Sequence, residues 1–154
     1  MTFDTEEFGV DPWAPCQWIE PRNDGSWEPS DQRVGKQALG LPVFDIDHEI
    51  IDIVAWSIKD ETRWWLRHRI ATHLGARYLA GMADTGARAM LATTPASWLR
   101  LRGMACCLLD WTDAPLDFLG PVAGLDFETP EIEAAFRKTL DERWQHARLR
   151  AILS

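Results

Sequence analysis

The sequence predicts an α+β fold built around a small central sheet. Two apolar runs with the length of buried strands carry this prediction, residues 50–56 and 104–111, because β-branched and aromatic residues favour strands. Three further segments have helical spacing or the residues that begin and end helices, near 61–74, 95–102 and 130–151. We expect the two strands to lie side by side and the helices to cover them.

Residues 1–42 are predicted to form an irregular arm. They are rich in Pro, Gly, Asp and Glu, and their apolar residues are scattered rather than periodic, which is typical of segments without regular structure. The tryptophans of this arm favour packing against the body, because a Trp side chain buries a large area. Residues 43–154 are then expected to form a single α+β domain, which fits a chain of 154 residues.

Residues 61–74 admit two interpretations. Asp60 can cap a helix and Gly75 can end one, because glycine tolerates the left-handed conformation of a helix end. A strand is the alternative, because arginine and large apolar residues alternate between Arg63 and Ile70. We favour the helix on the strength of its two end signals.

The two remaining helices both begin at a Thr-Pro pair. Thr94 can cap helix 95–102 and Thr129 can cap helix 130–151, and proline suits the first helical position. Between these helices, the apolar run 104–111 has the length and the flanks of a buried strand. The last helix carries an apolar stripe at helical spacing, so we expect it to cover the sheet.

The charge of the chain is unevenly distributed. The net charge is −8. Residues 1–62 hold fourteen acidic and four basic residues, residues 63–110 hold two acidic residues and seven arginines, and residues 111–154 hold eight acidic and five basic residues. A chain this acidic is repelled by nucleic-acid backbones and by anionic membranes, so neither is expected as a general partner.

A cytoplasmic location is expected. No apolar run approaches the ~20 residues that a bilayer crossing requires, and the acidic beginning of the sequence lacks the basic flank of a signal peptide. The three cysteines form neither an even disulfide set nor a CxxC metal motif. No cofactor is expected.

The alternation of acidic residues before the first strand suggests a metal site. Asp45, Asp47 and Glu49 would share one face of a strand, and Asp52 could be a further ligand. The simpler interpretation is a solvated sheet edge, because no matching cluster of Asp, Glu or His follows in the sequence. We therefore predict no metal, and keep these four carboxylates as the basis of an alternative function in phosphoryl transfer or nucleic-acid processing.

The segment RWWLRHR interleaves arginine with tryptophan. Such a pattern also occurs in platforms that stack single-stranded nucleic acid. Given the acidic chain, nucleic acid is an expected partner only if it binds through Arg63, Trp64, Trp65 and Arg67.

The favoured hypothesis is contact with a basic protein partner. Tryptophan is enriched at binding hot spots, and acidic residues steer a basic partner electrostatically. The candidate partner-binding residues of the N-terminal third are Trp13, Trp18, Trp27, Glu6, Glu7 and Asp11. A homo-oligomer that buries these tryptophans between copies is a further possibility.

Five motifs along the chain carry a family resemblance. DIVAW, RWWLR, a Leu-Gly pair, TPASWLR and CLLDW occur in this order between residues 42 and 111. This order resembles short proteins of prophages and integrated mobile elements in alphaproteobacteria. The chain departs from the pattern at Arg69, where a glycine is expected. The resemblance implies a mobile element in a bacterial cytoplasm as the setting, and implies no activity.

The sequence carries none of the common catalytic signatures that we sought. GxSxG, GxxxxGK[ST] and HExxH do not occur, so no nucleophile elbow, phosphate loop or zinc helix is predicted and no catalytic residue is assigned. The expected function is that of a small non-enzymatic acidic protein of a mobile element, an accessory or inhibitor that acts by protein–protein contact.

Overall fold

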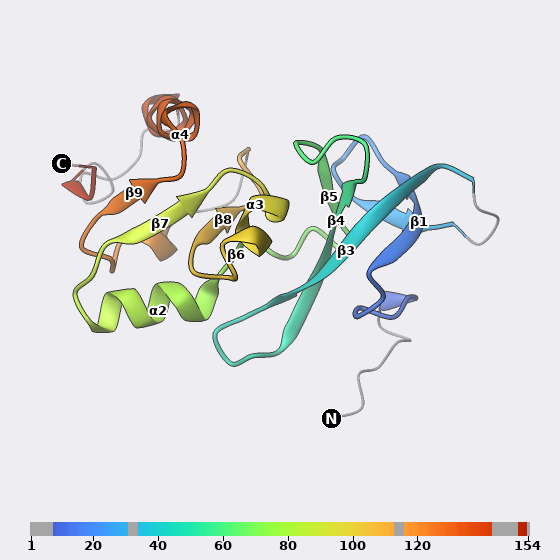
Figure 1. The fold of residues 1–154 in the computed structure, drawn as a ribbon, viewed down its shortest axis with the longest axis horizontal. Coiled ribbons are helices and arrows are strands. Elements are labelled where there is room, and N and C mark those ends of the chain that lie inside the picture. Colours follow the sequence, from blue (N-terminus) through green and yellow to red (C-terminus); the bar gives the residue numbers. More distant parts are fainter. Residues whose placement is uncertain (1–7, 31–33, 113–115, 143–150, 154) are drawn as a thin grey trace. The chain divides into compact units, whose positions relative to one another are not determined.

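Two separate β-sheets organise the chain, one in each of two units (Figure 1). The first unit is Met1–Ala71 and the second is Thr72–Ser154. The computed structural model describes residues 8–30, 34–112, 116–142 and 151–153. The predicted α+β class is confirmed by nine strands and three helices among the described residues. The single domain predicted for 43–154 is instead divided, because its two apolar strands belong to different units.

The sheet of the first unit is antiparallel and has the strand order β2-β1-β3-β4-β5. Its strands are β1 Cys16–Pro21, β2 Trp27–Pro29, β3 Lys36–Phe44, β4 Ile50–Ser57 and β5 Trp64–Leu66. The sheet curls until its two ends meet. Ser26 and Leu66 form an isolated bridge there, and the N–H of Leu66 donates to the carbonyl of Gly25 at 2.9 Å. This contact pairs backbone groups that an open sheet would leave at its edges.

The core of the first unit is built on tryptophan. Trp27 is fully buried and Trp65 is 8% exposed. They pack in one cluster with Phe8, Ile19, Ala38, Ile53 and Ala55. The indole N–H of Trp27 donates to the carbonyl of Ile53 at 3.2 Å, so the ring is buried without leaving its polar atom unpaired. Large aromatic area substitutes here for a larger number of aliphatic side chains.

The prediction of an irregular arm over residues 1–42 is wrong, because β1, β2 and most of β3 lie within it. These strands are stabilised by partners that are distant in sequence, as in the pairing of Cys16 with Leu39. Proline and glycine lower the local strand propensity of the segment. A local sequence pattern therefore does not predict these strands. Residues 1–7 and 31–33 lie outside the described residues.

The helix predicted over 61–74 is also wrong, and the alternative strand is present as β5. Trp64 of β5 pairs with Trp56 of β4. Asp60 caps a turn instead of a helix, because its Oδ1 accepts the N–H of Thr62 at 3.0 Å and the hydroxyl of Thr62 at 2.6 Å. Gly75 precedes a helix rather than ending one.

The second unit has a four-stranded sheet of order β6-β8-β7-β9. β7 runs parallel to β8 and β9, and β6 runs antiparallel to β8. The elements, in chain order, are β6 His73–Leu74, α2 Ala76–Asp84, β7 Ala89–Ala92, α3 Pro95–Arg100, β8 Cys106–Leu108, the 3₁₀ turn η1 Asp117–Leu119, β9 Leu125–Phe127 and α4 Pro130–Glu142. No helix among these residues is long and apolar enough to cross a bilayer.

The prediction that strands 50–56 and 104–111 lie side by side is wrong. The first run forms β4 in one sheet, and Cys106–Leu108 forms β8 in the other. Both runs are apolar, and apolarity alone does not specify which strand pairs with which. The neighbours of β8 are β6 and β7.

The two Thr-Pro helix starts are confirmed. In α3, the hydroxyl of Thr94 accepts the N–H of Ser97 at 3.0 Å, and the Ser97 hydroxyl accepts the N–H of Thr94 at 2.9 Å. This reciprocal pair satisfies backbone donors that a helix start leaves open. Phe136 and Leu140 bury the apolar stripe of α4 in the core of the second unit. The predicted continuation of α4 through 143–150 lies outside the described residues.

Gly75 offers a direct test of the fold of the second unit. Its φ is +92°, and a Cβ atom placed there would overlap the carbonyl oxygen of Ala105. We expect Gly75→Ala to lower the free energy of unfolding by more than about 2 kcal/mol, measured by urea denaturation. The matched control is Gly81→Ala in α2, where no atom lies within 4 Å of the added methyl. It should raise stability by about 0.5–1 kcal/mol. Equal effects of the two substitutions would contradict this backbone geometry.

Candidate functional site

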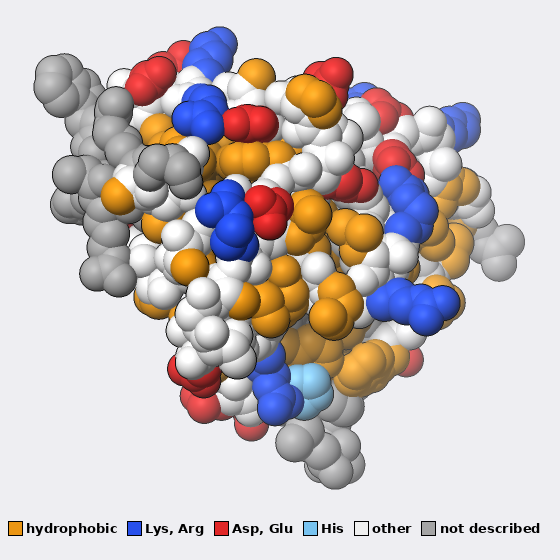
Figure 2. All heavy atoms as spheres, turned by 60° about the vertical axis from the view of Figure 1, so that its left-hand side comes forward, with side chains coloured by type: hydrophobic (Ala, Val, Ile, Leu, Met, Phe, Trp, Pro, Cys, Tyr) orange, Lys and Arg blue, Asp and Glu red, His pale blue; other side chains and the backbone are white. Residues whose placement is uncertain are grey.

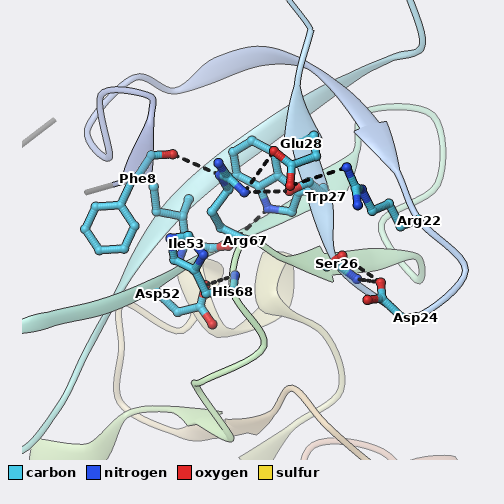
Figure 3. Close-up of polar contacts among 10 residues, drawn as sticks. All are labelled: Phe8, Arg22, Asp24, Ser26, Trp27, Glu28, Asp52, Ile53, Arg67 and His68. Atoms are coloured by element: carbon cyan, nitrogen blue, oxygen red, sulfur yellow. Dashed lines mark hydrogen bonds and ion pairs between the residues drawn. The ribbon is translucent and has the colours of Figure 1, made fainter. Parts of the chain in front are cut away.

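The Asp52 carboxylate is fully buried and is held by backbone N–H groups. Its Oδ1 accepts the N–H groups of Ile53 and His68, both at 2.9 Å (Figure 3). Its Oδ2 accepts those of Ile70 at 2.8 Å and Ala71 at 3.1 Å. A buried charge is tolerated when it is hydrogen-bonded in this way. Asp52 therefore holds the segment that follows β5 in place, and both of its carboxylate oxygens are occupied by backbone N–H groups.

Arg67 is the second buried polar anchor of the first unit. Its Nε donates to the carbonyl of Phe8 at 2.9 Å, and its Nη1 donates to the carbonyl of Trp27 at 3.3 Å (Figure 3). Nη1 also lies 3.2 Å from a carboxylate oxygen of Glu28, and the guanidinium lies 5.6 Å from the centre of the Trp27 ring. The Arg67 side chain is only 12% exposed. Its donors are directed into the unit.

The arginine and tryptophan residues of RWWLRHR do not form one shared exposed face. Trp65 belongs to the core, Trp64 is half-buried and Arg67 is directed inward. Of the four residues predicted as a nucleic-acid platform, only Arg63 is exposed. A stacking platform requires ring faces that an incoming base can reach. The geometry of this segment therefore gives no support to the platform.

The four carboxylates of the alternative metal site are not brought together. Asp45 does not continue β3. It caps the turn to β4, and its Oδ1 accepts the N–H groups of Asp47 and Glu49, both at 2.9 Å. Asp52 is occupied by the backbone, as described above. Among the residues that the structure describes, no group of three or more His, Cys, Asp or Glu side chains could hold a metal ion.

The predicted partner-binding residues are separated by the fold. Trp27 is a core residue, so its prediction as a surface contact is wrong. Trp18 is half-buried in β1, whereas Trp13 is 52% exposed and Asp11 is also exposed. Glu6 and Glu7 lie outside the described residues. Nothing in the local sequence distinguishes an exposed tryptophan from a buried one, because the difference arises from strand pairing.

Trp13 is part of an exposed aromatic cluster that the sequence did not reveal. Its ring centre lies 5.7 Å from that of Phe44, and Phe44 stacks on His48 with ring centres 4.4 Å apart and planes 8° from parallel. Ile46, in the same turn as His48, is 59% exposed. We call Trp13, Phe44, Ile46 and His48 the Trp13 patch.

Two tight turns present this patch. Asp11 accepts the N–H of Trp13 at 2.9 Å. In the β3–β4 turn, the N–H of Asp45 donates to the carbonyl of Glu49 at 2.9 Å, and His48 has a left-handed φ of 64°. Asp and Asn favour such turns because a side-chain oxygen can accept a backbone N–H. The acidic residues that suggested a metal site thus shape a turn that carries apolar side chains outward.

Asp and Glu are the charged residues of the two chain segments that form the Trp13 patch. Residues 8–16 and 39–58 contain no Lys or Arg. Asp11, Asp47 and Glu49 are exposed there, and Asp45 is half-buried. Figure 2 shows one face of the molecule, on which basic and acidic side chains are interspersed among apolar ones. The two segments that form the patch therefore combine exposed apolar area with carboxylates.

The buried cysteines are poor nucleophiles. Cys106 and Cys107 lie in the central part of the second sheet, and burial raises the pKa of both thiols well above the ordinary value. The thiolate is the reactive form of cysteine, so these side chains stay protonated and unreactive at neutral pH.

No protein-family model, no curated protein and no solved structure matches the chain. Function has to be inferred from the residues themselves.

His73 provides a pH-dependent test of the second unit. Its ring stacks on Phe118 with centres 3.8 Å apart, and burial lowers the pKa of His73 to about 4. Because the unfolded chain takes up a proton near pH 6.5 and the folded one does not, stability should fall as the pH drops from about 6.5 to about 4. The loss should reach up to about 3 kcal/mol in urea denaturation.

The matched variant for this test is His73→Phe, which keeps an aromatic ring against Phe118 and removes the titrating group. The difference in the free energy of unfolding between the unchanged chain and His73→Phe should depend on pH only between about pH 6.5 and about pH 4. Parallel curves for the two proteins would show that His73 does not contribute.

Proposed function

We propose that this chain acts by binding a basic protein through the Trp13 patch. It would serve as a non-enzymatic accessory or inhibitor of a mobile element in a bacterial cytoplasm. The observation that carries the proposal is the Trp13–Phe44–His48 cluster, which is presented by two chain segments with carboxylates and no Lys or Arg, residues 8–16 and 39–58. The setting rests on the resemblance to mobile-element proteins.

The chemistry of the patch supports this class of partner. A large aromatic side chain at the centre of an interface contributes much of the binding energy when a partner covers it. The carboxylates of the two segments increase the association rate of a basic partner and disfavour an acidic one. The patch accordingly fits a partner segment in which Lys or Arg residues flank an apolar side chain.

The same carboxylates disfavour a homo-oligomer built on this patch. In a two-fold contact, the patch would meet its own copy. Asp11, Asp47 and Glu49 of one copy would then face carboxylates of the other, and like charges repel at short range. A basic partner is therefore preferred to a second copy.

The alternative function in metal-dependent phosphoryl transfer has no comparable support. Asp45 is hydrogen-bonded within its turn, and both oxygens of Asp52 accept backbone N–H groups. Divalent-metal catalysis needs several carboxylate oxygens that converge on one point.

Site-specific cross-linking tests the proposal. A photo-reactive amino acid at Ile46, 59% exposed in the patch, should cross-link to a basic protein when the chain is irradiated in an extract of cells that carry the element. The partner is identified by mass spectrometry, purified and titrated calorimetrically. Trp13→Ala should weaken its binding by at least about tenfold, and binding should weaken as salt increases.

The matched control is Met104→Ala, which removes another apolar side chain, 65% exposed, from a segment outside the patch. It should leave the affinity unchanged. The proposal fails if Trp13→Ala and Met104→Ala bind equally well, or if the cross-linked product is a second copy of the chain.

A further inference from the structure

A second surface feature of the first unit shares no residue with the Trp13 patch. It is a hollow of about 400 Å³ between the beginning of β3 and the turn that joins β4 to β5. Lys36, Lys59 and Arg63 line it together with Asp60, and Trp18 of β1 forms part of its wall. A volume of this size falls in the range of small-molecule sites.

As the structure describes it, the lining of the hollow holds three cations and one carboxylate, Asp60. Hydrogen bonds from Thr62 and, to a smaller degree, the charges of Arg63 and Lys36 lower the pKa of Asp60. Among the residues that the structure describes, none of the three forms an ion pair within 4.0 Å. The Oδ1 of Asp60 accepts the N–H and hydroxyl of Thr62. The lining thus keeps a positive balance, although residues 1–71 together hold fourteen acidic and seven basic residues.

Two of these cations are held in place by the core. The ammonium of Lys36 and the guanidinium of Arg63 each lie 5.7 Å from the ring centre of Trp65, and Trp65 is only 8% exposed. Cation–π contact with a fixed ring reduces the freedom of both side chains. An anion bound in the hollow would be attracted by both cations.

The wall of the hollow adds a flat apolar surface to this charge. Trp18 is half-buried and lines the hollow. An indole ring stacks planar heterocycles, and nucleobases are the commonest of these. Gln37, also in the lining, can donate and accept hydrogen bonds.

From this combination we infer that the hollow binds a mononucleotide, with the phosphate between Lys36, Lys59 and Arg63 and the base against Trp18. The phosphate provides negative charge that balances the excess of cations in the lining. The base provides a planar group that inorganic phosphate does not have. This site is independent of the partner contact proposed above.

Nuclear magnetic resonance titration tests the inference on the full chain. The probes are adenosine monophosphate, guanosine monophosphate, adenosine and inorganic phosphate. At least one of the nucleotides should shift the indole N–H signal of Trp18, assigned with Trp18→Phe, and the amide signals of Lys36 and Lys59. Adenosine and inorganic phosphate should each bind at least about tenfold more weakly, because each lacks one of the two contacts.

Charge removal identifies the phosphate site. Lys59→Gln alters an exposed side chain that forms no hydrogen bond or ion pair within the described residues, so the variant should fold. It should weaken nucleotide binding by at least about threefold, and Lys36→Gln together with Lys59→Gln by at least about tenfold. The matched control is Lys138→Gln on α4, an exposed lysine outside the hollow, which should bind like the unchanged chain.

Three results would overturn the inference. The first is the absence of any shift at millimolar nucleotide. The second is inorganic phosphate that binds as tightly as either nucleotide, since the ring of Trp18 would then contribute nothing. The third is a single-stranded oligonucleotide that binds where both mononucleotides fail, since the hollow would then belong to an extended nucleic-acid surface.

Discussion

The buried carboxylate of Asp52 is the constraint on which the first unit depends. It lies within β4 and accepts N–H groups from three residues after β5, His68, Ile70 and Ala71. Without it, these donors would be buried or half-buried with no partner, and an unsatisfied buried donor costs about 1–3 kcal/mol. The Asp52 side chain therefore accepts the backbone N–H groups of this irregular segment, as the carbonyl groups of a neighbouring strand would in a regular sheet.

Arg67 extends the same arrangement in the opposite direction. It follows β5 directly, and its guanidinium reaches the carbonyl groups of Phe8 and Trp27. Asp52 and Arg67 together tie the segment around Phe8, the edge strand β2 and the end of β5 to β4. The most basic and aromatic part of the chain is thus used largely for folding. The surfaces of the first unit that we propose for binding are the Trp13 patch and the hollow beside Trp18.

Local patterns in the sequence predicted the elements that local interactions stabilise. The apolar run from Ile50 marked β4, and Thr94 and Thr129 marked the starts of α3 and α4, because a cap and its helix are neighbours in the chain. The α+β class followed from these elements. Strand pairing did not follow, since two apolar runs such as those of β4 and β8 look alike whether or not they are adjacent.

The elements of the site were hidden for a related reason. Asp52 is separated from its partners by up to 19 residues, so its acidic side chain suggested a metal ligand rather than a backbone anchor. Trp13 and Trp27 both lie in proline-containing stretches of the sequence. Trp13 is nevertheless exposed, whereas Trp27 is fully buried. Gly75 signals a left-handed conformation correctly, but that conformation begins α2 instead of ending a helix. The role of Asp52, the exposure of each tryptophan and the position of Gly75 at its helix all depend on contacts between residues distant in the sequence.

Amide hydrogen exchange tests the central role of Asp52 most directly. The N–H groups of His68, Ile70 and Ala71 lie outside any strand, and in an ordinary loop they would exchange rapidly. If the carboxylate binds them as described, they should exchange only when the first unit opens, at free energies close to those of the amides in β4. Rapid exchange of these three amides, while β4 remains protected, would contradict the account.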